Sequence, residues 1–223
     1  GRGCFSAGLF CRKLQSDYDD CSVGYEAVMS IPGASNPLLL ASAATAEDPY
    51  AISRSLRFNS GDSSFLSRTP SSAGNRKTWT WSGWVKRSKL DATQTFFSAA
   101  QDASNITRIR FESDNTLRFH HYAGNSLTGY LQTTQVFRDV SAWHHIVLAA
   151  DTTASTSSDR LKLYINGSQV TAFASTTYPA SDTEFFINSA NAHKISSEIV
   201  GNYLSGYLAD VQFLDGIAAS PTD

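Results

Sequence analysis

The chain contains very little cysteine. Its three cysteines, Cys4, Cys11 and Cys21, lie in the first tenth of the 223 residues, and the 202 residues after them contain none. No two of them have the CxxC spacing of a zinc site, and the nearest histidine is His120. An odd count leaves at least one thiol unpaired within the chain, which fits a reducing compartment or an intermolecular bond. We therefore expect packing, not disulfides, to hold the main domain together.

The chain also lacks an excess of charge and a long apolar run. Its 18 Lys and Arg residues nearly balance 20 Asp and Glu residues, for a formal net charge of −2. Without a broad positive field, sequence-independent binding to phosphate backbones has little support, so we expect no nucleic-acid partner. No run approaches the roughly 20 apolar residues of a membrane-spanning helix, and the N-terminus lacks the pattern of a signal peptide. We expect a soluble protein with no membrane insertion.

Residues 1–52 differ from the rest of the chain. Gly, Ser, Ala, Asp and Pro recur there without a sustained period, which is typical of an arm or linker. Its concentrated apolar patch is Pro37, Leu38, Leu39 and Leu40. We interpret this patch as an assembly or anchoring segment that docks on a neighbouring surface or on the domain itself.

From residue 53 onward the pattern is that of β-strands. Short stretches with apolar residues at every second position are separated by Gly, Asn, Asp and Ser turns. The strand spacing of about a dozen residues leaves no room for helical crossovers, which indicates antiparallel sheets. The sequence predicts an all-β, two-sheet antiparallel jelly-roll sandwich over residues 53–217, followed by a tail over 218–223. With 13 Phe, 9 Tyr and 4 Trp, it has the aromatic residues for one large core.

Individual stretches give more specific predictions. The turn GDSS after SLRFNS predicts a hairpin with the strand that opens at Phe65. In KTWTWSGWVKRS, Trp79 and Trp81 share one face and Trp84 points to the other, as in a central strand. Further predictions are a hairpin that turns at SDNT (113–116), a strand buried on both sides at WHHIVLAADTT, a hairpin that turns at Asn166-Gly167, and a last strand in GYLADVQFLDG whose residues 207, 209, 211 and 213 share one face.

These segments, in this order, resemble the concanavalin A-like lectin/glucanase superfamily, and especially its laminin-G and pentraxin-like domains. The similarity spans roughly residues 53–216. It is carried by Leu56, Phe58 and Asp62, by TWTWSGWVK, by the Trp-His-His strand that begins at Trp143, by the Leu-Tyr-Ile-Asn-Gly hairpin at 163–167, and by GYLADVQFLDG. The resemblance implies a concanavalin A-like jelly roll.

A narrower resemblance concerns SNPLLLA, ISRSLRFNSGDSSFLSRTPSSAGNRKTWTWSGWVKRS and YLADVQFLDGIAASPTD. These stretches are similar to laminin-G-type proteins that tailed phages encode, often described as tail or virion proteins. In that group the arm begins near Met29, so residues 1–28 depart from the pattern. Relatives tend to continue beyond SPTD, and we expect Asp223 to be a truncation or the limit of order. The resemblance implies a structural virion protein at the particle surface or tail, with other virion proteins as partners and a homo-oligomeric state.

Enzyme chemistry has little support in the sequence. Glucanases of this superfamily carry three carboxylates at alternating positions of one strand, and a retaining pair lies about 5 Å apart. Glu112 and Asp114 have part of that spacing, but no third carboxylate follows. The histidine pairs at 120–121 and 144–145 lie on predicted strands, so each pair points to opposite faces, with one ring partly buried and one exposed. We therefore predict no catalytic residues and no enzyme.

A binding site has better candidates. Trp84, His120 and Tyr122 lie on predicted outer faces, where exposed aromatic and polar groups are typical of carbohydrate contact. The alternative is that Trp84 belongs to the core. Some relatives bind calcium through rim oxygens, and the candidate ligands are Asp62, Asp102, Asn105, Asp151 and Asp159. They form no dense acidic loop, so we assign no metal and no cofactor.

Two functions remain in view. The first is a structural virion component, in a tail fibre or as a capsid decoration, whose β-sandwich faces outward as an adhesive module. The alternative is a lectin module that recognises a host surface polysaccharide, and the two are compatible. Glycoside hydrolysis ranks last because the carboxylate strand is missing.

Overall fold

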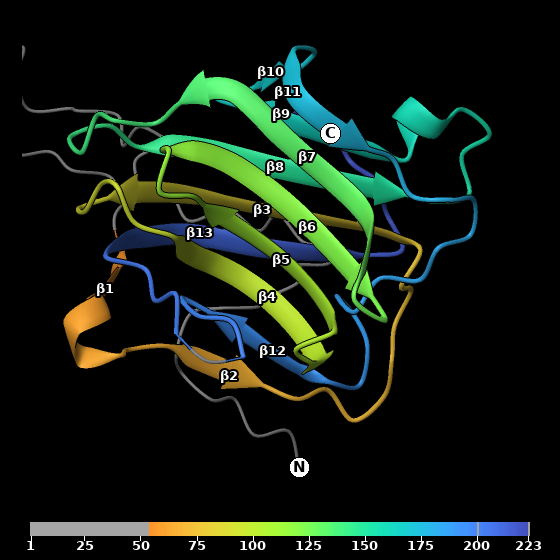
Figure 1. Ribbon diagram of the computed structural model, residues 1–223, viewed down its shortest axis with the longest axis horizontal. Helices are drawn as coiled ribbons and strands as arrows, with labels where there is room; N and C mark the ends of the chain where they lie inside the picture. Colours follow the sequence, from red (N-terminus) through yellow and green to blue (C-terminus); the bar gives the residue numbers. More distant parts are fainter. Residues whose placement is uncertain (1–53, 200, 223) are drawn as a thin grey trace, which may run out of the picture. The chain divides into compact units, whose positions relative to one another are not determined.

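The computed structural model describes residues 54–199 and 201–222, which form a β-sandwich (Figure 1). The predicted arm and its apolar patch at Pro37–Leu40 lie outside the described residues. The described residues contain strands and two short 3-10 turns, η2 (Ser60–Asp62) and η3 (Ser157–Asp159). None of the helical segments among these residues has the length and apolar character needed to cross a membrane.

Two antiparallel sheets form the sandwich, as the sequence predicted. The six-stranded sheet has the order β1-β13-β3-β8-β9-β10. Its strands are β1 (Leu56–Phe58), β13 (Gly206–Asp215), β3 (Thr78–Arg87), β8 (His144–Asp151), β9 (Leu161–Ile165) and β10 (Ser168–Gln169). The seven-stranded sheet has the order β11-β7-β6-β5-β4-β12-β2. Its strands are β11 (Phe173–Thr177), β7 (Ser126–Val136), β6 (Thr116–Ala123), β5 (Asn105–Phe111), β4 (Gln94–Asp102), β12 (Ala192–Ile195) and β2 (Leu66–Arg68).

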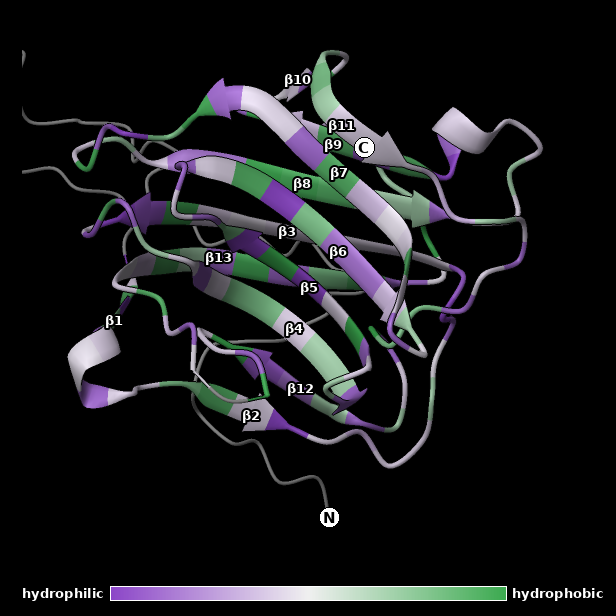
Figure 2. Cartoon of the chain, viewed as in Figure 1, coloured by the Kyte–Doolittle hydropathy of each residue, from purple (hydrophilic) through white to green (hydrophobic). Residues whose placement is uncertain are grey.

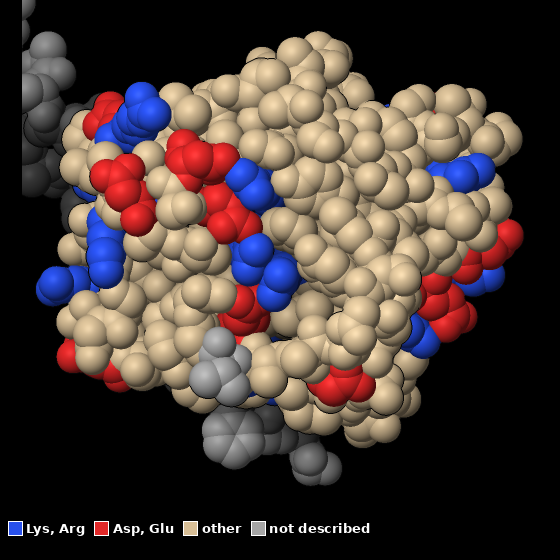
Figure 3. All heavy atoms as spheres, in the orientation of Figure 1, with Lys and Arg blue, Asp and Glu red and all other residues tan. Residues whose placement is uncertain are grey.

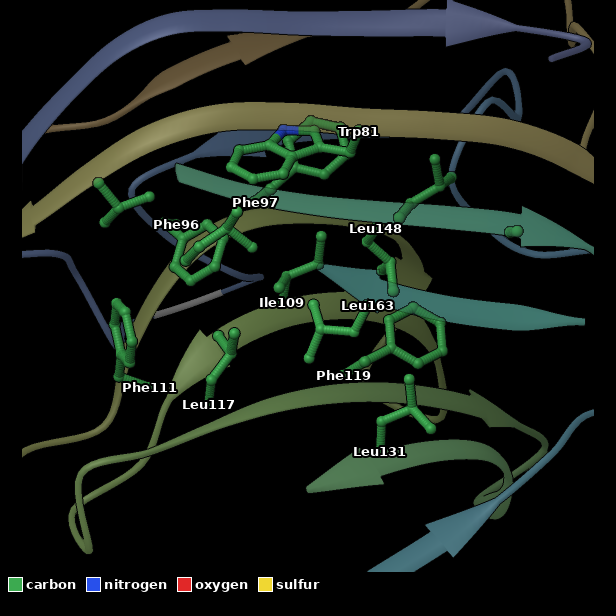
Figure 4. Packing of buried hydrophobic residues seen from close by; sticks show 14 of the residues in the cluster. Trp81, Phe96, Phe97, Ile109, Phe111, Leu117, Phe119, Leu131, Leu148 and Leu163 are labelled. Carbon is green, nitrogen blue, oxygen red and sulfur yellow. The ribbon is translucent and has the colours of Figure 1, made fainter. Parts of the chain in front are cut away.

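The core fills the space between the two sheets. Figure 4 shows Trp81, Leu148 and Leu163 pointing from the six-stranded sheet towards side chains such as Ile109 and Phe119 of the other sheet. Apolar and polar residues alternate along β5 and β6, whereas β8 is apolar along most of its length (Figure 2). This contrast follows from burial, because a strand that faces the core on one side and water on the other needs only one apolar face.

β3 lies in the middle of its sheet, as its sequence predicted. Trp79, Trp81 and Val85 are fully buried, and Trp84 points to the opposite face. The alternative that placed Trp84 in the core is therefore wrong. Gly83 also faces inward, and a Cβ there would lie 3.0 Å from the Trp81 ring and 3.3 Å from Val211. A larger residue would have to displace the indole that fills the centre of the core.

The alternation predicted for the last strand is wrong beyond Ala209. β13 pairs Ala209 with Trp84 but Gln212 with Ser82, so two residues of β13 stand opposite one residue of β3. This β-bulge includes Asp210, whose φ is +46°. The extra residue changes the inward positions from Leu208 before the bulge to Val211 and Phe213 after it. Strict alternation cannot predict this bulge, because apolar residues occupy both the odd-numbered and the even-numbered positions of the strand.

The hairpin predicted at residues 56–66 is also wrong. β1 pairs with β13 in the six-stranded sheet, whereas β2 pairs with β12 in the seven-stranded sheet. The chain passes between the sheets through η2, which ends at Ser63 in a left-handed conformation. The turn was predicted at the correct place, but a turn alone does not determine which sheet receives the next strand.

The remaining hairpin predictions are confirmed. β5 and β6 pair through the turn at residues 112–115, and β9 and β10 pair through Asn166 and Gly167, which both have positive φ. β8 lies between β3 and β9, with Ile146, Leu148 and Ala150 in the core. The two hairpins depend only on neighbouring sequence, which is why the pattern was sufficient for them.

Candidate functional site

Alternation along β5 and β6 produces a polar surface at the centre of the seven-stranded sheet. Because Ile109 and Phe119 face the core, their neighbours point outward. Arg108 stands opposite His120 in the register, Ile106 opposite Tyr122 and Arg110 opposite Arg118. Two predicted site residues, His120 and Tyr122, therefore lie on one face beside three arginines. We call the set Arg108, Arg110, Glu112, His120, Tyr122 and Glu198 the sheet-face cluster.

Glu198 reaches this face from the segment that follows β12. It is 6% exposed and forms ion pairs with Arg108 and, at 3.5 Å, with Arg110. Asn202 donates a further hydrogen bond to the same carboxylate. The segment thereby places a buried negative charge directly against the two arginines of β5.

Glu112 lies on the other side of Arg110. Its Oε1 atom is 2.5 Å from the Arg110 guanidinium, and its Oε2 atom accepts a hydrogen bond of 2.9 Å from Thr93. One guanidinium therefore joins two carboxylates. Figure 3 shows acidic and basic side chains gathered over the left and centre of this face, next to a broad area without charged side chains.

An aromatic group lies beside these charges. The rings of His120 and Tyr122 are nearly parallel, with centroids 6.0 Å apart and an interplanar angle of 14°. Tyr130 of β7 packs against His120 at 5.0 Å, and the Arg108 guanidinium lies 5.5 Å from the centre of the Tyr122 ring. Tyr122 is half-buried, so part of its ring faces solvent next to a fixed cation.

His120 is buried and neutral. Burial, together with the nearby charges of Arg110 and Arg108, lowers the pKa of His120 to about 2. Its Nδ1 atom has no hydrogen-bond partner among the described residues, and the same holds for Nε of both arginines. The predicted division of the histidine pair into one buried and one exposed ring is wrong, because His120 is 4% exposed and His121 is 1% exposed. The sheet-face cluster covers the His120 ring, and the core covers the His121 ring.

His121 points into the core and makes folding sensitive to acid. Its Nδ1 atom is 2.8 Å from the Thr107 hydroxyl, which also accepts a hydrogen bond from the Phe186 amide. Which of the two groups donates in the Thr107–His121 hydrogen bond depends on the tautomer of the imidazole. Burial and the charge of Arg76 lower the pKa of His121 to about 4.

Mild acid should therefore destabilise the domain. Below pH 6.5 His121 is protonated in the unfolded chain, whereas in the folded chain it stays neutral down to about pH 4. The stabilisation that is present above pH 6.5 is therefore lost as the pH falls. We expect a loss of about 1 kcal/mol between pH 6.5 and 5.5 for each such group. Urea unfolding at these pH values measures the loss, and His121→Gln should reduce it. Equal stability at both pH values would contradict the assignment.

The third predicted site residue, Trp84, lies on the other sheet. It stacks on His145 with ring centroids 5.0 Å apart, and His145 Nε2 is 2.9 Å from the Ser82 hydroxyl. Trp84 therefore faces away from His120 and Tyr122, and the three residues form two separate surfaces. A single site that includes all three is excluded by this geometry.

The candidate calcium ligands are scattered. Asp62 bonds to Asn59 in the η2 turn, and Asp102 accepts hydrogen bonds from Asn105 in the β4–β5 turn. Asp151 and Asp159 lie near each other, at the outer face of the six-stranded sheet. Within residues 54–199 and 201–222, no group of three or more His, Cys, Asp or Glu residues could hold a metal ion.

The glucanase arrangement is also not formed by the residues that partly matched it. Glu112 is held by Arg110 and Thr93, whereas Asp114 lies in the β5–β6 turn and pairs with Arg118. The two carboxylates therefore belong to different ion pairs. Glu198 could not be predicted as part of the site, because it comes from a loop 86 residues beyond Glu112 in the chain.

Most of the chain matches the model of a known protein family. Residues 59–222 match the Laminin_G_3 family model, described as the concanavalin A-like lectin/glucanases superfamily. The chain belongs to this superfamily. Membership of the concanavalin A-like superfamily confirms the resemblance carried by TWTWSGWVK and GYLADVQFLDG. No curated protein sequence matches the chain.

Several solved structures align with the chain at low sequence identity. Domains LG4-5 of the mouse laminin alpha1 chain align with a TM-score of 0.54 and 10% identity, covering 76% of this chain and 45% of that one. A heptameric SAP-like pentraxin from Limulus polyphemus aligns at 0.47 and 21% identity, covering 66% and 68%. The CBM40 domain of a Ruminococcus gnavus IT-sialidase aligns at 0.49 and 13% identity, covering 69% and 94%. The laminin alignment indicates the fold alone.

Proposed function

We propose that the domain is a non-catalytic, glycan-binding module and that the sheet-face cluster is its binding surface. The observation that carries this proposal is the half-buried Tyr122 ring, which lies beside the Arg108 guanidinium and the His120 ring. A sugar has an apolar face of C–H groups and a rim of hydroxyls. Tyr122 offers a surface for the first and Arg108 offers hydrogen-bond donors for the second.

The energetic cost of the cluster supports a binding role. Burying ion pairs on a sheet face is often no more stabilising than covering it with apolar residues. The pairing of Arg108 and Arg110 with Glu198 instead fixes both guanidinium groups in one orientation. A ligand that meets such groups loses less free energy to ordering side chains, which favours binding.

The same contacts argue for a binding module and against glycoside hydrolysis. Hydrolysis requires one carboxyl group that acts as an acid and one that acts as a nucleophile or base. Here Glu112 and Glu198 both pair with Arg110, and Glu198 pairs with Arg108 as well. Carboxylates that are paired with arginines in this way serve to position the arginines, not to act as an acid or a nucleophile.

The biological setting that we propose is the virion of a tailed phage. The support is the resemblance of SNPLLLA, of the stretch from Ile52 to Ser88 and of YLADVQFLDGIAASPTD to phage laminin-G-type tail and virion proteins. In this setting the domain is an outward-facing, homo-oligomeric adhesive part of a tail fibre or capsid decoration. Its partners are other virion proteins and a host surface glycan. Mass spectrometry and antibody labelling of purified particles test this: absence of the chain from particles would contradict it.

The glycan proposal makes a prediction about two aromatic residues. Tyr122→Ala should weaken binding on a glycan array at least tenfold, because the stacking surface is lost, while Trp84→Ala should leave that binding unchanged. Both variants remove an aromatic side chain from an outer face, so each is a control for the other. Equal binding by Tyr122→Ala and the unmodified protein to every glycan would contradict the proposed surface.

A further inference from the structure

The outer face of the six-stranded sheet contains a pocket of about 390 Å³. Its lining includes the small side chains of Ala149 and Ala219. Asp151 follows Ala149 on the same face of β8, and Lys162 and Tyr164 point outward from β9 because Leu161 and Leu163 face the core. The pocket therefore lies where the small side chain of Ala149 leaves space on the outer face, next to the polar side chains of β8 and β9.

The segment after β13 forms one wall of this pocket. Thr80, on the outer face of β3, donates a hydrogen bond of 2.7 Å to the carbonyl of Ile217 and accepts one of 2.8 Å from the amide of Ala219. Thr80 is 1% exposed and Ala219 is 8% exposed, so this contact is covered. One buried hydroxyl thus fixes the segment across the sheet and holds the wall in place.

The polar groups around the pocket have unused hydrogen-bonding capacity. Oδ1 of Asp151 accepts hydrogen bonds from the amide and hydroxyl of Thr153, and Oδ1 of Asp159 pairs with Lys162 at 3.3 Å. Among the described residues, the contacts of both carboxylates use Oδ1, which leaves Oδ2 of each for a ligand. The Tyr164 ring is half-buried beside them.

We propose that this pocket binds one neutral sugar ring. Two carboxylates accept hydrogen bonds from sugar hydroxyls, the Lys162 ammonium donates one, and the Tyr164 ring and the alanines contact the apolar face. The volume is within the range of about 300–1,000 Å³ that is usual for small-molecule sites. An anion would meet two carboxylates and a divalent cation would meet Lys162, so a neutral polyhydroxy ligand fits this set of charges best.

This site goes beyond the proposed function, because it lies on the opposite sheet from the sheet-face cluster and shares no residue with it. Two separate sugar sites on one domain would let it engage two glycan branches. Such double engagement raises the overall affinity without improving either site.

The test uses the methyl glycosides of glucose, galactose and mannose at millimolar concentration, with the unmodified domain, Tyr164→Ala, Asp159→Asn and Tyr122→Ala. Two-dimensional NMR should show shifts of the amides of Ala149 and Tyr164 with at least one glycoside. Tyr164→Ala and Asp159→Asn should weaken that binding at least tenfold, whereas Tyr122→Ala should retain it. The spectra of the free variants report whether each is folded.

Three results would overturn the proposal. They are no shift around the pocket with any of the three glycosides, shifts that persist unchanged in both pocket variants, and shifts that disappear in Tyr122→Ala. Failure of the proposed binding surface on the sheet-face cluster can be told apart from these results, because it would appear as unshifted amides around Tyr122 and Arg108. Thr80→Val supplies a second perturbation of the pocket: it should weaken glycoside binding by releasing residues 217–219 while preserving the rest of the spectrum.

Discussion

Trp81→Ala is expected to lower the free energy of unfolding by about 4 kcal/mol, the largest effect of any change considered for this domain. The indole is 1% exposed at the centre of β3, and its ring packs against Phe96 at 5.3 Å and Phe97 at 6.0 Å. These two residues come from the opposite sheet, so Trp81 joins the layers of the sandwich. Alanine would leave a cavity between them that surrounding side chains fill only in part.

Urea unfolding monitored by far-UV circular dichroism measures this loss. Trp84→Ala is the matched control, because it removes the same side chain from the same strand but from the outer face. We expect that variant to lose about 1 kcal/mol, for its contact with the His145 ring. Equal losses in the two variants would show that β3 does not divide its tryptophans between core and surface.

Glu198→Gln should cost about 3 kcal/mol, although the residue lies on the surface of the sheet and not in the core. The change preserves the shape of the side chain but removes the charge that Arg108 and Arg110 share. Those arginines are only 17% and 13% exposed, so water compensates them poorly. The cost is mainly that of leaving Arg108 without its partner carboxylate and Arg110 with Glu112 alone.

The matched control is Asp114→Asn, which removes a carboxylate from the ion pair with Arg118 in the neighbouring turn. Asp114 is 45% exposed, and an exposed pair contributes less than about 1 kcal/mol. Urea unfolding in low and high salt compares the two variants. A loss below 1 kcal/mol for Glu198→Gln would contradict the account of a buried charge network.

Most of the fold could be predicted because strand alternation reports burial directly. Trp79 and Trp81 on one face of β3, and Ile109 and Phe119 across the β5–β6 hairpin, are positions where the sequence pattern and the structure agree. The failures occur where alternation carries no information. The bulge at Asp210 switches the core-facing positions of β13 from even-numbered to odd-numbered residues. Both sets of positions contain apolar residues, so the pattern does not reveal the switch.

Only the residues of the candidate site that lie on strands could be predicted from the sequence. His120 and Tyr122 were assigned to an outer face from alternation, and the same rule applied to β5 would have placed Arg108 and Arg110 beside them. Glu198 could not be found in this way, because a loop without period places it against β5. Trp84 was grouped with these residues because alternation identifies outer faces but does not say which of two sheets each one belongs to.

The pocket on the six-stranded sheet was missed for a related reason. It depends on the segment after β13 lying over Thr80, a contact between residues 137 positions apart. Asp151 and Asp159 were noted in the sequence as oxygen donors for calcium. The structure instead places them with Lys162 and Tyr164, a set that suits a sugar better than a cation.

The central claim is that a glycan binds on the sheet-face cluster. The most direct measurement is a crystal structure of the domain with the glycan that binds best on an array. The account predicts a sugar ring stacked on Tyr122, with a hydroxyl or other acceptor hydrogen-bonded to the Arg108 guanidinium. A glycan bound elsewhere, with Tyr122 and Arg108 unoccupied, would contradict the claim.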